Sequence, residues 1–293
     1  PRDPNPGDSA IWLGTRACFA GLGAPPPLYV ASDRTYRADH LRQRMAHGTI
    51  FLLGGGSFGD LWPDRQAFRE QVVRDFPDRR IVQLPQTLQF GSASNLATAR
   101  RRLAGHPALT VLARDRRSLA LAQEGLGLEA RLAPDAAFAL PRAGRGRPPS
   151  QDVLWLKRVD QESAFDAGPA IDAHDWPPEE RTRAWRRMRR LSRRARRSRR
   201  CSARRAAGLT QVFDRLAAER LERAHDFLDT GRVVVTDRLH GHILCLLRRQ
   251  PHVVLDNAYG KVGAFGDQWT RHAPEVRWTA SPAEAAGCAR GML

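Results

Sequence analysis

The chain has 293 residues, of which 42% are hydrophobic, and this allows one large or two ordinary globular domains. Its apolar runs are shorter than the roughly 18 residues that a membrane span requires, and no signal peptide opens the chain, so we expect a cytoplasmic protein. The formal charge of +17 suggests an anionic partner, but residues 181–205 hold 14 arginines and no acid, which leaves only +3 for the rest.

The start of the chain is a polar loop before a helix. Asn5-Pro6-Gly7-Asp8 precedes a helical stretch over residues 9–20. Asp8 could cap this helix by accepting N–H groups of its first turn. Alternatively, Asn5 and Asp8 line a ligand-binding cleft, and the two interpretations are compatible.

A glycine run follows the first clear strand. Residues 28–31 and 49–53 are predicted strands, with a short helix over 37–46 between them. Gly54, Gly55, Gly56 and Ser57 end the second strand, where glycines let the backbone turn sharply and offer N–H groups to a ligand. The run matches neither a Walker loop nor G-x-G-x-x-G. A tight turn without a ligand is the alternative.

Strands and helices then alternate as far as residue 141. Helices are predicted at 66–76, 95–103 and 116–124, and strands at 80–87, 109–113 and 131–135. Gln86 lies at one strand tip and Arg114 at the next. The alternation predicts an N-terminal Rossmann-like domain with a parallel sheet over residues 1–141. Residues 142–151, rich in Pro, Gly and Arg, read as a linker.

The second half, residues 152–293, repeats the alternation. Its predicted strands are 152–158, 232–236, 252–256 and 276–279, and its helices are 209–228 and 282–290. Lys157 and Arg158 end the first strand, and Gly231 is expected to be the C-cap of the long helix. The fold class is therefore α/β, with two Rossmann-like domains. Two such domains facing a cleft form the arrangement known from GT-B glycosyltransferases, so we expect a GT-B-like fold.

An Arg-rich insertion, residues 179–208, interrupts the second half. Trp185, Met188 and Leu191 recur every three residues among its arginines, as in a basic helix with a narrow apolar stripe. A solvated or disordered insertion is the favoured interpretation. The second is an interfacial helix at the anionic inner face of a membrane. Nucleic-acid binding ranks third, because no aromatic stacking platform accompanies the arginines.

The stretch from Arg232 to His242 is the one around which the chain is organised. Three valines form a buried strand that runs into a helix, so Arg238 and His240 lie on the turn where an open α/β sheet binds its ligand. Arg238 offers a planar fork for carboxylate or phosphate, and His240 can carry a proton near neutral pH. The alternative is that Arg238 pairs with Asp237 and that His240 caps the helix.

An ordered set of motifs resembles the polysaccharide pyruvyltransferase family across nearly the whole chain except about residues 142–208. The motifs are Asn5 to Ile11, Gly54 to Asp60, Ala113-Arg114-Asp115, Pro134 to Phe138, Thr236 to Gly241 and Asp256 to Lys261. Family members carry a strand before the first motif, which either lies upstream of residue 1 or is lost here.

The resemblance implies transfer of pyruvate from phosphoenolpyruvate to two hydroxyls of a sugar or lipid-linked glycan, in exopolysaccharide or cell-wall synthesis. It assigns catalysis to His240 and Arg238 and donor binding to these two with Arg114, Leu239 and Lys261. The acceptor side would hold Asn5, Asp8, Gly55, Gly56, Ser57 and Gln86. No cofactor or metal is implied, and phosphoenolpyruvate is a co-substrate.

Two rival functions stay open at this point. A GT-B glycosyltransferase would use a nucleotide sugar and needs an acidic ribose contact, for which Asp256 is the candidate. A nucleic-acid-binding protein would act through the Arg-rich segment. The four cysteines show no C-x-x-C spacing, so we expect reduced thiols without a zinc site or disulfide framework.

Overall fold

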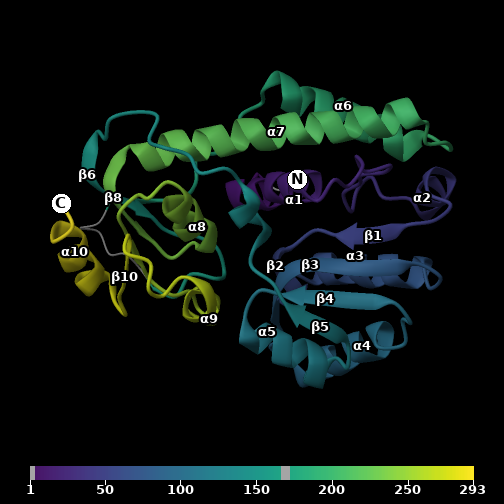
Figure 1. Cartoon of the computed structure of the whole chain (residues 1–293), viewed down its shortest axis with the longest axis horizontal. Helices are drawn as coiled ribbons and strands as arrows, with labels where there is room; N and C mark the ends of the chain where they lie inside the picture. Colours follow the sequence, from purple (N-terminus) through teal and green to yellow (C-terminus); the bar gives the residue numbers. More distant parts are fainter. Residues whose placement is uncertain (1–3, 166–171) are drawn as a thin grey trace. The chain divides into compact units, whose positions relative to one another are not determined.

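The chain forms two compact units, each built on a parallel sheet (Figure 1). The computed structural model describes residues 4–165 and 172–293. The first unit contains Ile11–Ala136 and Glu180–Ala217, and the second contains Pro4–Ala10, the described part of Ala137–Glu179 and Ala218–Leu293. The α/β class with parallel sheets is confirmed. By their contacts, residues 4–10 belong to the second unit and residues 180–217 to the first. The division made from the sequence had put residues 4–10 in the N-terminal domain and residues 180–217 in the C-terminal one.

The sheet of the first unit has an interrupted edge. Its order is β1-β3-β4-β5, and β2 pairs with β3 beyond the end of β1. A Cβ at Gly54, between β1 and β2, would lie 2.5 Å from the Pro85 carbonyl oxygen, so only glycine fits there. The glycine run therefore continues as a strand and does not form the predicted sharp turn. The strands are β1 (Thr49–Leu52), β2 (Gly55–Gly59), β3 (Arg80–Gln89), β4 (Leu109–Ala113) and β5 (Glu129–Leu132).

Helices bury the apolar side chains of this sheet. Ile81 and Val111 are fully buried in one cluster with Phe76, Leu103 and Leu126 from the surrounding helices. These helices are α2 (Ala38–Arg44), α3 (Pro63–Asp75), α4 (Ala93–Leu103), α5 (Arg116–Ala120) and the π-helix η1 (Leu121–Gly125). The helices predicted over 37–46, 66–76, 95–103 and 116–124 are therefore confirmed, with bounds that differ by a few residues.

The strand predicted at residues 28–31 is absent from the described first unit. Three prolines precede this segment, and side chains hold it in place of a strand ladder. The Tyr29 hydroxyl donates to the Thr35 carbonyl oxygen at 3.4 Å and accepts from the Arg37 N–H at 3.1 Å. An apolar tetrapeptide without a neighbouring strand has no ladder to join, which periodicity alone cannot reveal.

The Arg-rich segment contains the predicted basic helix, and its arginines are exposed to solvent. The favoured interpretation is therefore confirmed for a solvated segment and wrong for a disordered one. Helix α6 (Arg183–Arg197) lies alongside the N-terminal part of α7 (Ala203–Asp229) in the first unit (Figure 1). Met188, Leu191 and Ala195 pack against Leu209 and Phe213 of α7. Within residues 4–165 and 172–293, no helix has both the length and the apolar composition needed to cross a bilayer.

The sheet of the second unit has the order β10-β9-β8-β6-β7, which is the doubly wound order 2-1-3-4-5 in chain terms. Val233 and Val235 face Ala285 and Ala289 of α10, whereas the opposite face carries Leu156, against which Gly241 of α8 packs. The elements of this unit are β6 (Gln151–Leu156), β7 (Ala173–His174), β8 (Gly231–Thr236), β9 (His252–Val254), β10 (Val276–Trp278), α8 (Leu239–Leu247), α9 (Lys261–Trp269) and α10 (Pro282–Arg290). Residues of both units belong to α1 (Pro6–Gly21) and to the 3-10 helix η2 (Ala136–Ala139).

Gly231 is not the C-cap of the long helix, as had been predicted. Helix α7 ends at Asp229, and Gly231 is the first residue of β8. A Cβ at Gly231 would lie 2.5 Å from the Cβ of Leu154 in the neighbouring strand β6. The glycine is thus required by the close approach of two strands and not by a helix end.

A pair of buried histidines lies beneath α8. His242 Nδ1 and His252 Nε2 are 2.7 Å apart, and His242 Nε2 lies 2.8 Å from the Thr270 hydroxyl. His252 Nδ1 donates to the Gln250 carbonyl oxygen at 2.8 Å, so His252 Nε2 must accept the proton of His242. Burial lowers the pKa of His242 and lowers that of His252 to about 4. Both rings are therefore neutral at pH 7.

Candidate functional site

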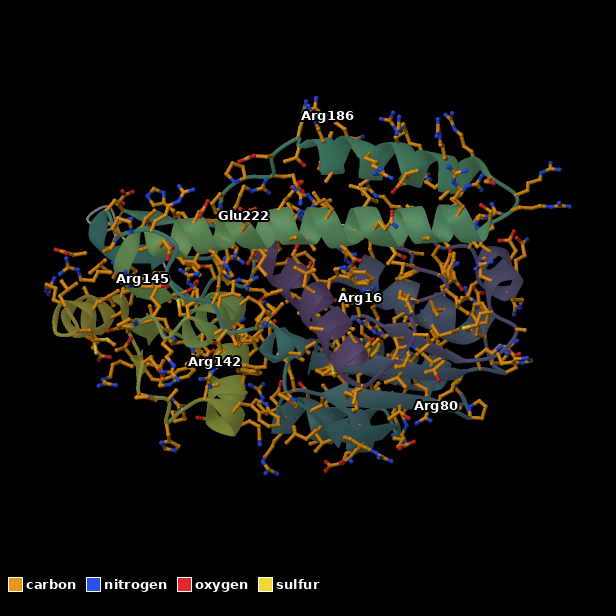
Figure 2. The ribbon with its side chains drawn as sticks, turned by 45° about the horizontal axis from the view of Figure 1, so that its top comes forward. Arg16, Arg80, Arg142, Arg145, Arg186 and Glu222 are labelled. Atoms are coloured by element: carbon orange, nitrogen blue, oxygen red, sulfur yellow. The ribbon has the colours of Figure 1, made fainter. Side chains whose placement is uncertain are left out.

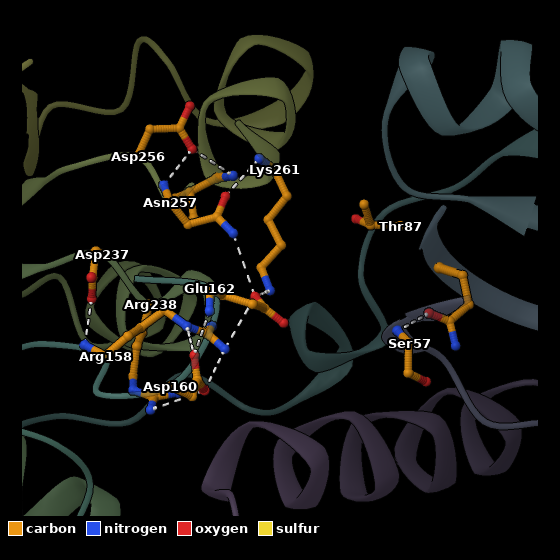
Figure 3. Close-up of polar contacts among 12 residues, drawn as sticks. Ser57, Thr87, Arg158, Asp160, Glu162, Asp237, Arg238, Asp256, Asn257 and Lys261 are labelled. Atoms are coloured by element: carbon orange, nitrogen blue, oxygen red, sulfur yellow. Dashed lines mark hydrogen bonds and ion pairs between the residues drawn. The ribbon is translucent and has the colours of Figure 1, made fainter. Parts of the chain in front are cut away.

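Charged residues gather at the carboxyl edge of the second unit's sheet (Figure 3). Arg158 follows β6, Asp175 follows β7, and Asp237 and Arg238 follow β8. Lys261 begins α9, after β9. In a sheet of this strand order, ligands bind at the carboxyl ends where the chain reverses direction across the sheet, here between β6 and β8.

Arg238 is held at the turn between β8 and α8. Its backbone N–H donates to the Thr236 hydroxyl at 3.0 Å, and its Nη2 donates to the Asp175 carboxylate and lies 3.9 Å from Asp160 Oδ2. The side chain is 8% exposed, and its buried Nε has no hydrogen-bond partner among the described residues. The ion-pair partner of Arg238 is therefore Asp175. The alternative drawn from the sequence, a pair between Arg238 and Asp237, is wrong.

Glu162 joins two further cations in the same cluster (Figure 3). The Lys261 amine donates to Glu162 Oε2, and Arg158 Nη2 lies 3.1 Å from the same oxygen. Arg158 also donates to both oxygens of Asp160, at 2.8 and 2.9 Å. Arg158, Arg238 and Lys261 therefore each hold an internal carboxylate.

Burial and ion pairing act in opposite directions on these groups. Burial disfavours the charged form of Glu162, but the charges of Lys261 and Arg158 outweigh it and lower the pKa of the Glu162 carboxyl. Burial raises the pKa of Asp237, although one of its oxygens accepts the Arg158 backbone N–H at 2.8 Å. The cluster is thus held by charge, and an incoming anion can bind its cations by exchange with a carboxylate.

His240 lies against the first turn of α1. It is the second residue of α8 and is half-buried. A Cβ added to Gly7 would lie 2.4 Å from His240 Nδ1, so the imidazole and the helix start are in direct contact. The Asn5 side chain accepts the Gly7 N–H at 2.9 Å. Because α1 begins at Pro6, Asp8 lies inside the first turn, and the prediction that it precedes and caps the helix is wrong.

Leu239 has a packing position. It is the first residue of α8 and only 2% of its surface is exposed. Its burial fits a packing role at the start of the helix. The donor-binding role implied by the resemblance stays a prediction.

Arg114 belongs to the first unit, where its charge is already paired. It directly follows β4 and is 1% exposed. Its Nη1 donates to Asp135 Oδ2 at 2.6 Å, and its Nε donates to the Thr87 hydroxyl at 2.8 Å. The next residue, Asp115, caps α5 by accepting the Ser118 N–H at 2.7 Å. The arginine is thus fixed in one orientation by its own unit.

Gln86 bridges the interruption between β1 and β2. Its Oε1 accepts the Ser57 N–H and its Nε2 donates to the Leu53 carbonyl oxygen, each at 3.3 Å. Gly55 pairs with Gln86 in the ladder at a φ of +135°, and Gly56 follows it in β2. In this conformation, both ends of the Gln86 amide are engaged within the first unit.

Asp256 acts as a helix cap. Its Oδ1 accepts the N–H groups of Val262 and Gly263 at the start of α9, each at 3.0 Å. A nucleotide-sugar transferase would need this carboxylate for a ribose. Because the Asp256 carboxylate accepts hydrogen bonds from α9, it does not support the nucleotide-sugar glycosyltransferase as a function.

The sequence missed the carboxylates of the cluster. In the structure, Arg238, Leu239, His240, Lys261, Asn5 and Asp8 belong to the second unit, and Arg114, Gly55, Gly56, Ser57 and Gln86 belong to the first. Asn5 and Asp8 had been predicted to lie in the N-terminal domain. Alternating charges at Arg158, Asp160 and Glu162 after a strand were a usable signal. Asp175 gave none, because the strand before it has only two residues.

Comparison with known proteins identifies relatives over most of the chain. A family model described as polysaccharide pyruvyl transferase matches residues 5–259. Pyruvyl transferase 1 of Schizosaccharomyces pombe is 31% identical over 92% of this chain and 68% of its own length. EpsO of Bacillus subtilis, which carries the provisional name of a pyruvyl transferase, is 29% identical over 93% and 84%. The crystal structure of an uncharacterised Klebsiella pneumoniae protein shares the fold, with a TM-score of 0.58, 17% identity and coverage of 94% and 89%.

Proposed function

Because the chain belongs to the polysaccharide pyruvyl transferase family, we propose that it takes pyruvate from phosphoenolpyruvate and attaches it as a ketal to two hydroxyls of a glycan. Family membership makes the chain a transferase of pyruvyl groups with a polysaccharide acceptor. The donor, the ketal and the release of phosphate are the additions of this proposal. A lipid-linked form of the acceptor and a GT-B-like arrangement of the units stay predictions.

The observation that carries the proposal is the convergence of three cations in one unit, with His240 two residues after one of them, Arg238. Phosphoenolpyruvate has a carboxylate and a phosphate on a small skeleton, so its binding needs several cations aimed at one place. Arg158, Arg238 and Lys261 occupy the carboxyl edge of one sheet and bind carboxylates there already. The buried Nε of Arg238 adds a donor without a partner in the described chain.

Donor binding on this proposal is an exchange of ion pairs. The donor carboxylate and phosphate replace Asp175 on Arg238 and Glu162 on Lys261, while Arg158 keeps Asp160 as its partner. Each exchange keeps an anion on the cation, the displaced Glu162 retains Arg158 as its partner, and the displaced Asp175 is partly exposed and can be solvated by water. Arg238 presents its planar fork to the carboxylate, and Lys261 acts on the phosphate as a point charge.

The imidazole of His240 supplies the proton. In its protonated form it donates a proton to the methylene carbon of the enol, which leaves a cationic centre at carbon two. One glycan hydroxyl attacks this carbon and gives its proton to the imidazole of His240, which has become neutral. Phosphate then departs with the bonding electrons, and the second hydroxyl closes the ketal as its proton passes to the departing phosphate. Lys261 stabilises the leaving phosphate, while Arg238 holds the carboxylate. A positioned acid of this type typically contributes ~10²–10⁴ in rate.

The first-unit residues keep their predicted roles within the proposal. Arg114 would contact the donor, and Gly55, Gly56, Ser57 and Gln86 the acceptor. The pairing of Arg114 with Asp135 means that an active role requires the guanidinium to bind a further anion through its remaining N–H groups. Comparing the KM for phosphoenolpyruvate in Arg114→Lys and the parent chain measures this contribution, because lysine keeps the charge but loses the fork.

The decisive experiment is phosphate release from phosphoenolpyruvate across a panel of glycan acceptors, with the ketal detected by mass spectrometry. We expect acceptor-dependent phosphate release and a product heavier by one pyruvyl ketal. His240→Ala should lose at least ~10²-fold in kcat. His272→Ala, a change at an exposed histidine of the same unit, is the matched control. Near-full turnover by His240→Ala with normal donor binding would exclude the proton-donor role.

A further inference from the structure

The outer face of α6 carries an unusual density of uncompensated charge. Nine arginines lie between Arg183 and Arg197, and all nine are exposed. None of them forms an ion pair with any residue in 4–165 or 172–293. Figure 2 shows these side chains, including the labelled Arg186, extending outward from the helix. Arg183, Arg186, Arg187 and Arg190 line a shallow hollow of about 560 Å³.

The helix is divided into a narrow packed edge and a wide charged face. At about 100° per residue, Ala184, Met188, Leu191 and Ala195 fall within about 60° of arc, whereas the nine arginines span about 180°. The charged face is about 21 Å long. The narrow apolar edge is packed against Leu209 and Phe213 of α7. The apolar side chains of α6 are therefore not available for insertion into the hydrocarbon core of a bilayer.

We propose that this face docks on an anionic lipid bilayer by charge alone, without insertion of apolar side chains. A flat, densely anionic surface matches a straight row of arginines spread over half of a helix, because about five of them can reach one plane together. Arg186, Arg189, Arg190, Arg193 and Arg197 lie nearest to the outward direction. Long arginine stems let the guanidinium groups on the flanks bend toward the headgroups.

A bilayer fits the face better than nucleic acid does. Binding of single strands relies on aromatic side chains that stack with bases. The one aromatic residue of α6, Trp185, is half-buried, and the guanidinium groups of Arg181 and Arg189 lie 5.7 and 4.9 Å from its ring centre. Readout of bases in a duplex uses residues such as Asn and Gln beside Arg, and α6 contains neither.

The binding strength follows from the number of arginines near the surface. Each basic residue close to an anionic membrane increases partitioning roughly fivefold at physiological salt. Replacing four outward arginines should therefore lower partitioning by at least ~10²-fold. High salt should abolish binding of the parent chain, because the face contributes charge and no apolar burial.

The test is co-sedimentation of the full chain with vesicles of neutral phosphatidylcholine or of phosphatidylcholine with about 30% phosphatidylglycerol. We compare the parent chain with a variant in which Arg186, Arg189, Arg190 and Arg193 are changed to Gln. The control variant removes the same charge from four exposed arginines elsewhere, Arg80, Arg116, Arg232 and Arg277. Glutamine is a good helix former, and thermal melting verifies that both variants fold.

The expected result is binding to anionic vesicles only, lost in the α6 variant and kept in the control variant. An equal loss of vesicle binding in both variants would mean that binding depends only on the net charge of the chain, and this would overturn the proposal. Persistent binding by the α6 variant, or no binding by the parent chain, would overturn it as well. Tighter binding to a short DNA duplex or RNA strand than to anionic vesicles at the same ionic strength would assign the face to nucleic acid instead.

Discussion

A methyl group at Gly7 should inactivate the site while leaving the chain folded. In Gly7→Ala the new Cβ would lie 2.4 Å from Nδ1, 2.6 Å from Cγ and 3.0 Å from Cβ of His240. An ordinary contact needs about 3.4 Å or more, so the imidazole must move by about 1 Å, and rotation of the ring cannot relieve the contact at Cβ. A displacement of this size at a reacting group can cost ~10²-fold in rate.

The assay is steady-state phosphate release, with thermal melting as the measure of folding. Alanine gains up to about 1 kcal/mol over glycine in a helix, which offsets part of the strain, so we expect the melting temperature to change little and kcat to fall. Gly21→Ala, at the other end of the same helix, meets nothing within 4 Å and should keep kcat. In a His240→Ala background, Gly7→Ala should cause no further loss. A Gly7→Ala enzyme with kcat within about twofold of the parent would refute the contact between α1 and the imidazole as a determinant of the rate.

Three further predictions follow from the ion pairs and the buried histidines. Asp175→Asn removes the carboxylate that holds Arg238, so the KM for phosphoenolpyruvate should fall and the thermal shift caused by the donor should grow; an unchanged shift would contradict ion-pair exchange. Acidification from pH 7 to 5 should lower the free energy of unfolding by ~2 kcal/mol through His252 alone, because its folded pKa of about 4 lies below the unfolded 6.5 and the unfolded chain takes up the proton first. Urea unfolding at the two pH values measures this, and His252→Asn should flatten the dependence. Asp135→Asn leaves the buried Arg114 without its carboxylate and should cost ~3–5 kcal/mol in urea unfolding, whereas a loss below about 1 kcal/mol would mean that water reaches the guanidinium.

The regular elements could be predicted because their apolar periodicity is local. The strand at residues 109–113 and the helix at 282–290 have the bounds that the sequence indicated. The Arg-Leu-His motif was rightly expected at the turn after a buried strand. The motif lies at the carboxyl edge of the sheet because the strands are parallel, and the alternation of strands and helices had already indicated a parallel sheet.

The remaining features depend on contacts between distant parts of the chain. Nothing near Gly7 in sequence shows that it lies against His240, more than two hundred residues later. The pairing of Arg238 with Asp175 rests on a two-residue strand that no propensity would find. The glycine at position 231 was interpreted as a helix cap, whereas the neighbouring strand at Leu154 is what excludes a side chain there. Tertiary packing determines which residues are in contact at these positions, and local sequence patterns do not predict it.

In the proposed exchange of ion pairs, the carboxylates that hold the cations of the cluster have a consequence for selectivity. A row of bare guanidinium and ammonium groups would collect any phosphate metabolite present at high concentration. Here a competitor with a single anionic group can replace only one of Asp175 and Glu162, and the other cation stays satisfied without it. Only a molecule bearing two negative groups at the right separation gains from both replacements at once. On this proposal, the same acids that balance the charges of Arg238 and Lys261 act as a threshold against inorganic phosphate and simple carboxylic acids.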